Sequence, residues 1–197
     1  MHHVDRNTPW EEIWEAMTVL RAQGKIIYVG SSNFAGWHIA AAQEAAKDFH
    51  AFGLISEQSI YNLATREIEM EVIPAAQYYG VGVLAWSPLH RGMLTGVLQL
   101  DQSRGRYTDA HLAKFQSQLE SYEQLCAKIG AEPSQVATAW ILSRPGITGP
   151  VIGPSRIAQV EDAIKSLDLN LDASTLAELD KIFPGYKTSP EIGRAHV

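Results

Sequence analysis

The stretch Ile26-Ile27-Tyr28-Val29-Gly30-Ser31-Ser32-Asn33 decides the fold class. Residues 26–29 form a short apolar run rich in β-branched side chains, which is typical of a buried parallel strand. The run ends in a glycine and small polar residues, and residues 36–47 follow as a predicted helix. We therefore predict a strand, a turn and a helix in succession, which is the unit that builds a parallel sheet.

The same succession recurs along the chain. Further apolar runs predict strands over residues 52–57, 81–86 and 151–152. Helices are predicted over residues 9–23, 65–79, 112–129, 133–140, 158–167 and 173–182. We expect Thr8 to cap the first helix, because a proline and then Glu11 follow it in the order of a capping box.

Alternating strands and helices leave two architectures, an open doubly wound sheet and a (β/α)8 barrel. No GxGxxG turn follows a predicted strand, so the dinucleotide fingerprint of the open sheet is absent. Polar residues follow several successive strands, which is typical of the carboxyl face of a barrel. A whole barrel takes roughly 250 residues, whereas this chain has 197 and about four strands, or five if its first residues end one. The sequence therefore predicts part of a (β/α)8 (TIM) barrel.

Composition excludes several classes of partner. The net charge is −6, which disfavours nucleic acids and anionic membranes because both require a basic surface. No apolar run approaches the roughly 20 residues that span a bilayer, and the N-terminus lacks the pattern of a signal peptide. The single cysteine, Cys126, permits no internal disulfide and favours a reducing compartment, the cytoplasm. His2 and His3 have no further ligand cluster in the sequence, so no metal site is expected.

Four segments, taken together, carry a family resemblance. They are 2-HHVD-5 with 7-NTPWEE-12, 24-GKI-26 with 29-VGSSNF-34, 85-AWSPL-89, and 151-VIGPSR-156. In this order and spacing they resemble the aldo-keto reductases, over the chain from its first residues to about Pro190. The resemblance implies that residues 1–191 are the C-terminal portion of a barrel domain, from the end of the fourth strand to the eighth. Residues 192–197 do not continue that pattern, and we expect them to be a non-native tail.

The resemblance implies a nicotinamide-binding group. Ser32, Asn33 and Gln58 match the residues with which the family hydrogen-bonds the nicotinamide carboxamide, and amides and hydroxyls suit that role chemically. Trp86 matches the aromatic residue that stacks on the nicotinamide ring. The alternatives are an ordinary turn at Ser32-Asn33 and ordinary core packing for Trp86.

The resemblance also implies sites for the phosphates of NADP(H). The loop that matches the pyrophosphate-binding stretch contains Ser87, Pro88, Leu89, Arg91 and Gly92. The segment that matches the 2′-phosphate and adenosine site contains Gly153, Ser155, Arg156, Gln159 and Asp162. A helix start with a guanidinium suits a phosphate group. Ala163 stands where the family commonly has asparagine, which puts one adenine hydrogen bond in doubt; for Arg91 and Arg156 a plain surface position is the alternative.

The implied reaction is the NADPH-dependent reduction of aldehydes or ketones to alcohols. In the family a tyrosine is the proton donor, and an aspartate and a lysine beside it tune its acidity. These three residues come from the first three strands, which would precede Met1. None of the chain's tyrosines matches the catalytic position. Only the substrate-orienting histidine carries over, to His2 rather than His3, because adjacent strand residues face opposite ways. We expect the 197-residue chain, expressed as written, to be inactive and poorly folded.

Two other functions are compatible with parts of this pattern. One is a non-catalytic, NADPH-binding regulatory subunit resembling the potassium-channel β subunits, which carry asparagine where this chain has His2. The other is an unrelated barrel enzyme such as an isomerase or lyase, which the nicotinamide-binding residues disfavour. The sequence decides neither the carbonyl substrate nor the oligomeric state.

Overall fold

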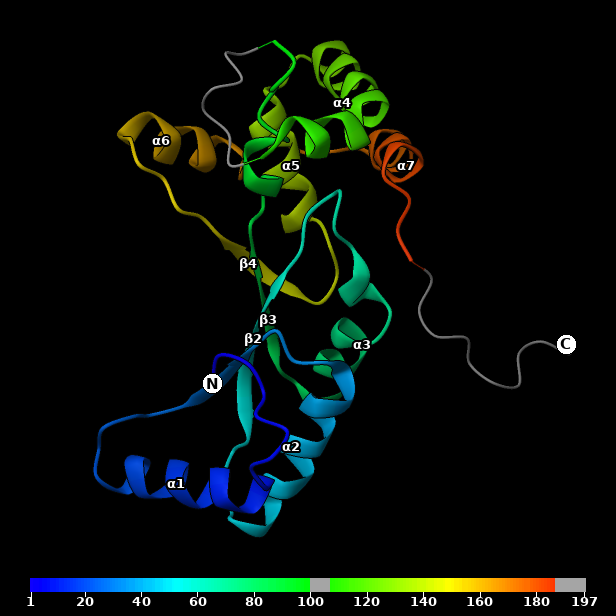
Figure 1. Cartoon of the computed structure of the whole chain (residues 1–197). Coiled ribbons are helices and arrows are strands. Elements are labelled where there is room, and N and C mark those ends of the chain that lie inside the picture. Colours follow the sequence, from blue (N-terminus) through cyan, green and yellow to red (C-terminus); the bar gives the residue numbers. More distant parts are fainter. Residues whose placement is uncertain (100–106, 187–197) are drawn as a thin grey trace, which may run out of the picture.

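The computed structural model describes residues 1–99 and 107–186 and shows an α/β fold built on a parallel sheet (Figure 1). The sheet has the order β1-β2-β3-β4. Its strands are β1 (Val29–Ser32), β2 (Leu54–Ile60), β3 (Gly82–Trp86) and β4 (Ile147–Val151). The sequential order contains no reversal, so the described sheet is singly wound and lacks the switch point of a doubly wound fold.

Helices connect and flank the strands. They are α1 (Trp10–Ala22), α2 (Gly36–Asp48), α3 (Val72–Tyr79), α4 (Asp109–Ile129), α5 (Pro133–Leu142), α6 (Ile157–Lys165) and α7 (Ala173–Ile182), with short 3-10 turns at Glu67–Glu69 and His90–Gly92. Helix α2 packs against α3 and α1, and α5 packs against β4. Because α2, α3 and α5 follow one flank of the sheet in Figure 1, the core lies between these helices and one sheet face.

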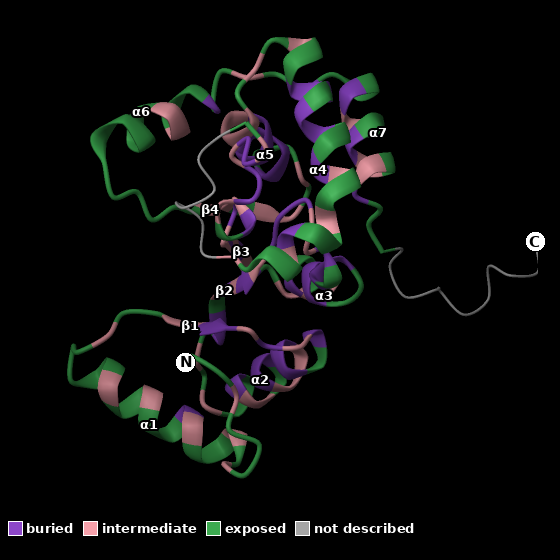
Figure 2. Cartoon of the chain, turned by 45° about the horizontal axis from the view of Figure 1, so that its top comes forward, coloured by how far each residue is buried: buried purple, intermediate pink, exposed green. Residues whose placement is uncertain are grey.

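The two faces of the sheet differ in burial. The helices differ too: in Figure 2 much of α5 is buried, whereas α6 is mostly exposed. On β3, Val83 and Ala85 are completely buried against the helices, whereas Leu84 and Trp86, which point the other way, are only partly buried. Strand alternation requires this division, since successive side chains point to opposite faces. Fully buried strands were predicted, but the described sheet is covered on one face and partly open on the other.

The first strand lies later in the chain than predicted. Ile27 and Tyr28 are 74% and 59% exposed, and β1 begins at Val29. Its glycine allows close approach to β2, because a Cβ at Gly30 would lie 2.4 Å from the Ser56 Oγ. Hydrogen-bonded pairing with β2, rather than apolar character, therefore sets the strand's limits. Strand β2 runs later than predicted, to Ile60, whereas β4 begins earlier than predicted, at Ile147, so the predicted limits 52–57 and 151–152 were wrong.

Several helix starts also differ from the prediction, and α4 begins at Asp109 rather than at residue 112. Pro9, not Thr8, is the N-cap of α1, and no side chain caps this helix. The hydroxyl of Thr8 instead donates to Asp5 Oδ2 at 3.1 Å, so the predicted capping box does not form. Helix α3 begins at Val72 rather than residue 65, after the 3-10 turn.

A buried arginine joins segments that are far apart in sequence. The Arg66 guanidinium donates to both Glu69 carboxylate oxygens and to Asp180 Oδ1 and the Phe183 carbonyl of the α7 region. It also lies 5.0 Å from the centre of the Trp140 ring on α5. Arg66 thus links α5 and α7 to the loop after β2. Over the part of the chain that the structure describes, no helix is both long and apolar enough to cross a membrane.

Candidate cofactor-binding site

The predicted nicotinamide-binding residues meet at the carboxyl ends of neighbouring strands. Ser32 ends β1 and pairs in register with Gln58, and Trp86 ends β3 beside Ile60. Since cross-strand partners share a face, Ser32, Gln58 and Trp86 lie on the partly open face of the sheet. Gln58 lies within β2, not at its end as predicted.

A chain of hydrogen bonds orients this group. The Ser32 hydroxyl donates to the Gln58 carbonyl at 2.8 Å, and the Asn33 Nδ2 donates to Ser32 Oγ at 3.1 Å. The indole N–H of Trp86 donates to Asn33 Oδ1 at 3.0 Å. This hydrogen bond fixes the Trp86 ring relative to the Asn33 amide. Neither an ordinary turn at Ser32-Asn33 nor ordinary core packing of Trp86 requires such a bond. Within the described part of the chain, the side chain of Gln58 makes no hydrogen bond, so its amide can meet a ligand.

Backbone strain gathers at the same strand ends. Among the described non-glycine residues with φ in the left-handed region are Asn33 (φ 59°), Ser87 (φ 57°), His90 (φ 45°) and Arg91 (φ 59°). Such conformations are uncommon outside glycine and cluster at ligand-binding sites. The turns after β1 and β3 are thus held in special geometries next to Trp86.

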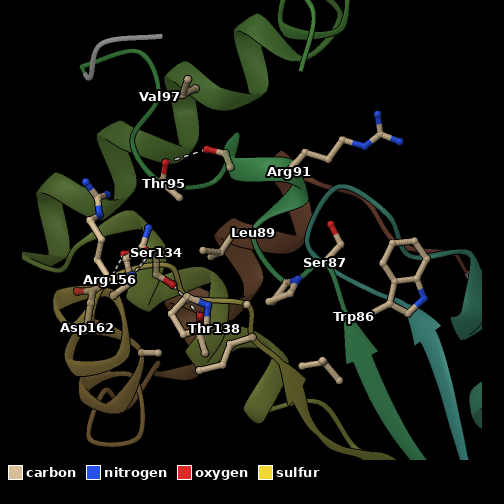
Figure 3. A pocket seen from close by; sticks show the side chains of 18 of the residues that line it. Trp86, Ser87, Leu89, Arg91, Thr95, Val97, Ser134, Thr138, Arg156 and Asp162 are labelled. Atoms are coloured by element: carbon tan, nitrogen blue, oxygen red, sulfur yellow. Dashed lines mark hydrogen bonds between the residues drawn. The ribbon is translucent and has the colours of Figure 1, made fainter. Parts of the chain in front are cut away.

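A large cavity extends from Trp86 (Figure 3). It has a volume of about 1100 Å³, above the usual range for drug-sized ligands. Predicted residues that line it are Trp86, Ser87, Pro88, Leu89, Arg91, Gly92, Gly153, Arg156, Gln159 and Asp162. The cavity thus brings the loop after β3 and the segment after β4 together, because these strands are neighbours in the sheet.

The charges of the cavity favour an anion. In Figure 3 Trp86 and Arg91 lie on one side of the cavity, and Arg156 and Asp162 lie on the other. Asp162 is the one acidic side chain among the described residues that line it, and it accepts hydrogen bonds from Ser134 Oγ and from Gln135 Nε2. The two guanidiniums are therefore suited to separate phosphate groups of one ligand.

The start of α6 is closed by one of its own side chains. Gln159 Oε1 accepts from the Ser155 N–H at 2.8 Å, from the Ser155 hydroxyl at 3.2 Å and from the Arg156 N–H at 3.2 Å. Ser155 does not line the cavity in the described structure, although the sequence predicted a phosphate contact there. The Ser155 and Arg156 donors that could bind an anion at this helix start are therefore present, and they are hydrogen-bonded to the side-chain oxygen of Gln159.

The cavity also uses residues that the sequence analysis missed. Ser134 and Thr138 reach it from α5, and Thr95, Val97, Gln99 and Tyr107 reach it from the segments after the β3 loop. The two α5 residues stand four apart, so they share one face of the helix. A small polar pair on an otherwise apolar helix was the available signal.

His90 anchors the loop after β3, which carries Arg91. Its side chain is 8% exposed, its Nδ1 lies 3.2 Å from Thr65 Oγ1, and its ring packs on His111 and Phe115. Burial lowers the pKa of His90 to about 4, with smaller contributions from the positive charge of His111, Arg91 and Lys114. The imidazole is therefore neutral at pH 7 and acts as a packed loop anchor.

His2 lies apart from the cavity. Residues 1–5 form no strand, and the rings of His2 and His3 are both exposed and contact each other at 4.3 Å. The strand alternation that was used to choose His2 over His3 does not apply, because the backbone there is irregular. The amino group of Met1 donates to the Gly30 carbonyl at 2.7 Å, which holds this segment beside β1. In the described ranges no three His, Cys, Asp or Glu side chains are placed to hold a metal ion.

Parallel βα units with a cavity at the carboxyl ends of the strands define an α/β protein. The sequence profile of the Aldo/keto reductase family matches residues 1–183, and the chain belongs to this family. It is 46% identical over 188 residues to the uncharacterized oxidoreductase YrpG of Bacillus subtilis (strain 168), covering 94% of this chain and 57% of that protein.

Further relatives are named as a channel subunit and as a reductase. The chain is 30% identical to a putative voltage-gated potassium channel subunit beta of Schizosaccharomyces pombe, covering 92% of this chain and 57% of the relative. It is 32% identical to versiconal hemiacetal acetate reductase of Aspergillus parasiticus, covering 92% of this chain and 55% of that enzyme. The chain thus spans little more than half the length of these relatives.

Proposed function

We propose that this chain binds NADP(H), with the nicotinamide at Ser32, Asn33, Gln58 and Trp86 and the phosphates in the cavity. The observation that carries the proposal is that the nicotinamide-binding group and the cavity are continuous. Trp86 is hydrogen-bonded to Asn33 and also lines the cavity that leads to Arg156. One extended ligand with a planar amide-bearing ring at one end and phosphates along its length fits this arrangement.

Each part of the chain would have a distinct task in binding. The Gln58 amide, which has no hydrogen-bond partner among the described residues, and Asn33 would hold the carboxamide, and Trp86 would cover one face of the ring. The loop containing Ser87, Pro88, Leu89, Arg91 and Gly92 would bind the pyrophosphate. Gly153, Ser155 and Arg156 would receive the 2′-phosphate when Gln159 turns toward the adenosine, with Asp162 beside it.

We further propose that the complete protein reduces aldehydes or ketones. When bound, the cofactor supplies the hydride for that reduction. His2 would orient the carbonyl oxygen of the substrate, and the aspartate, tyrosine and lysine of the family would come from outside this sequence. The substrate is a small carbonyl compound, and the single buried cysteine fits a reducing, cytoplasmic location.

The proposed architecture is the C-terminal part of a (β/α)8 barrel, comprising residues 1–191, with residues 192–197 outside the domain and outside the described residues. The singly wound order of four parallel strands supports it, since a barrel is wound in this way. The open face and the coverage of just over half of each relative also support it.

A second candidate is a regulatory subunit that binds NADPH without turnover. The similarity to a putative potassium channel subunit beta favours it. The two functions share the cofactor site and differ in the reaction. Steady oxidation of NADPH by the complete protein with an aldehyde would favour the reductase, and binding without oxidation would favour the subunit.

Calorimetric titration of the complete protein with NADPH and NADH tests cofactor binding, because the 197-residue chain by itself is expected to fold poorly. We expect Arg156→Ala to weaken NADPH binding about tenfold or more, because a charge-assisted hydrogen bond contributes roughly 1.5–3 kcal/mol. NADH, which lacks the 2′-phosphate, should be unaffected. Arg21→Ala on α1, away from the cavity, is the matched control. Equal effects on both cofactors, or no binding by the unaltered complete protein, would contradict the proposal.

A further inference from the structure

The carboxylate of Glu57 is completely buried beneath the candidate nicotinamide site. Its side chain is 0% exposed and lies on β2, directly before Gln58. Alternation along the strand directs Gln58 to the open face and Glu57 to the face covered by helices. Among the described residues, Glu57 forms no ion pair. A buried carboxylate without a cation is costly unless hydrogen bonds satisfy it.

Three donors satisfy this carboxylate. The hydroxyl of Ser31 donates to Glu57 Oε2, the Phe34 N–H donates to Oε1 at 3.1 Å, and the Ser59 hydroxyl donates to Oε1 at 2.6 Å. Ser31 and Phe34 are the residues that flank Ser32 and Asn33. Glu57 therefore holds both ends of the turn that carries two of the proposed carboxamide-binding side chains.

The turn requires such support. Asn33 has a φ of 59°, a left-handed conformation that is uncommon outside glycine although asparagine tolerates it. Its N–H donates to the Gln58 carbonyl at 3.0 Å, and its side-chain oxygen accepts from Trp86. The Asn33 backbone is thus fixed by Gln58, and the next residue is fixed by Glu57. A change at Glu57 would tilt the Asn33 amide and the Trp86 ring together.

We propose that Glu57 is a positioning residue, whose carboxylate sets the Ser32-Asn33 turn for the nicotinamide carboxamide. The inference rests on the proposed cofactor site. What matters is the reach of the side chain to the Phe34 N–H, and not its charge, because the contacts are hydrogen bonds from neutral groups. Glu57 acts at the nicotinamide end alone, since the adenosine end is held by the segment after β4.

Two substitutions separate reach from charge. Glu57→Gln keeps the length and an oxygen for Phe34, whereas Glu57→Asp keeps the charge and shortens the side chain by one methylene. Calorimetry would measure the Kd for NADPH and for 2′,5′-ADP, which carries the adenosine end without nicotinamide. We expect Glu57→Asp to raise the NADPH Kd about tenfold, the equivalent of one lost hydrogen bond. Glu57→Gln should stay within about threefold, and the Kd for 2′,5′-ADP should stay constant in both variants.

Gln43→Ala is the matched control. Gln43 is also buried and bonds both the N–H and the carbonyl of Leu54, at the opposite end of β2. It should lower the melting temperature without changing the ratio of the two Kd values. The inference is overturned if Glu57→Gln and Glu57→Asp weaken NADPH equally, if 2′,5′-ADP weakens in step, or if Glu57→Asp has no effect. These measurements use the complete protein. If the unaltered protein binds neither compound, the proposed function fails together with this inference; if it binds both, the two variants decide this inference alone.

Discussion

Replacing Arg66 with methionine tests how the fold is held together. The Arg66 side chain is 5% exposed and donates to Glu69 at 2.9 and 3.1 Å, to Asp180 at 2.6 Å and to the Phe183 carbonyl at 2.8 Å. Methionine fills similar space beside Trp140 but donates no hydrogen bond. The substitution therefore leaves the Glu69 carboxylate without its principal cation.

The two carboxylates contribute unequally to the expected loss. The Asp180 side chain is 45% exposed, so water replaces its lost partner at little cost. The Glu69 side chain is only 10% exposed and retains the Tyr61 hydroxyl at 2.6 Å and a longer contact to Arg144 at 3.4 Å. Removing one partner of a buried pair costs about 3–5 kcal/mol. We expect a fall of that size in the free energy of unfolding, or roughly 10 °C in the Tm.

Urea unfolding followed by circular dichroism would measure this loss. Lys47→Met is the control, because the Lys47–Glu44 pair is exposed and its removal should leave the midpoint unchanged. The double variant Arg66→Met/Glu69→Gln should recover part of the loss, since it removes the unpaired charge. A midpoint for Arg66→Met equal to that of Lys47→Met would refute the reasoning.

Two further predictions concern the site. Burial lowers the pKa of His90 to about 4 in the folded chain, below its unfolded value of 6.5. The contribution of His90 to stability should therefore be complete above about pH 6.5. It should fall toward pH 4 by at most about 1.4 kcal/mol per pH unit. His90→Asn, which tolerates the φ of 45°, should flatten that decline in urea titrations at several pH values; an unchanged slope would contradict it. Trp86→Leu should weaken NADPH binding about tenfold in calorimetry through loss of ring stacking, while Trp37→Leu on the exposed side of α2 should not; equal effects would argue against stacking.

Helices were predicted closely where caps and periodicity agree. The helix predicted over 173–182 has the same limits in the structure, because the Asp172 carboxylate accepts from the Thr175 N–H at its start. The predicted α/β class is also confirmed, since strand–helix alternation along the chain is sufficient for a parallel sheet.

The prediction 81–86 agrees closely with β3 (Gly82–Trp86), but the limits of the other three strands were predicted poorly for a physical reason. An apolar run reports burial, whereas a strand is delimited by its hydrogen-bonded neighbour. Ile27 and Tyr28 are apolar but precede the pairing with β2, and Ser31 and Ser32 are polar but lie within it. A single sequence does not show directly which residues of neighbouring strands pair with one another.

The sequence predicted the separate segments of the candidate site but not the hydrogen bonds that join them. The loop after β3 and the segment after β4 could be chosen from their motifs, but the Trp86–Asn33 hydrogen bond joins residues 53 apart and depends on the register of three strands. Glu57 was assigned only to a strand end. A charged residue inside an apolar parallel strand was the signal that it had a specific partner.

A crystal structure of the chain grown with NADP⁺ would test the central claim most directly. The account predicts the nicotinamide carboxamide within hydrogen-bond distance of Asn33 and Gln58, with the ring against Trp86. It also predicts the pyrophosphate along the loop after β3 and the 2′-phosphate at Arg156. A cofactor bound elsewhere, or one whose nicotinamide does not reach Trp86, would contradict the account.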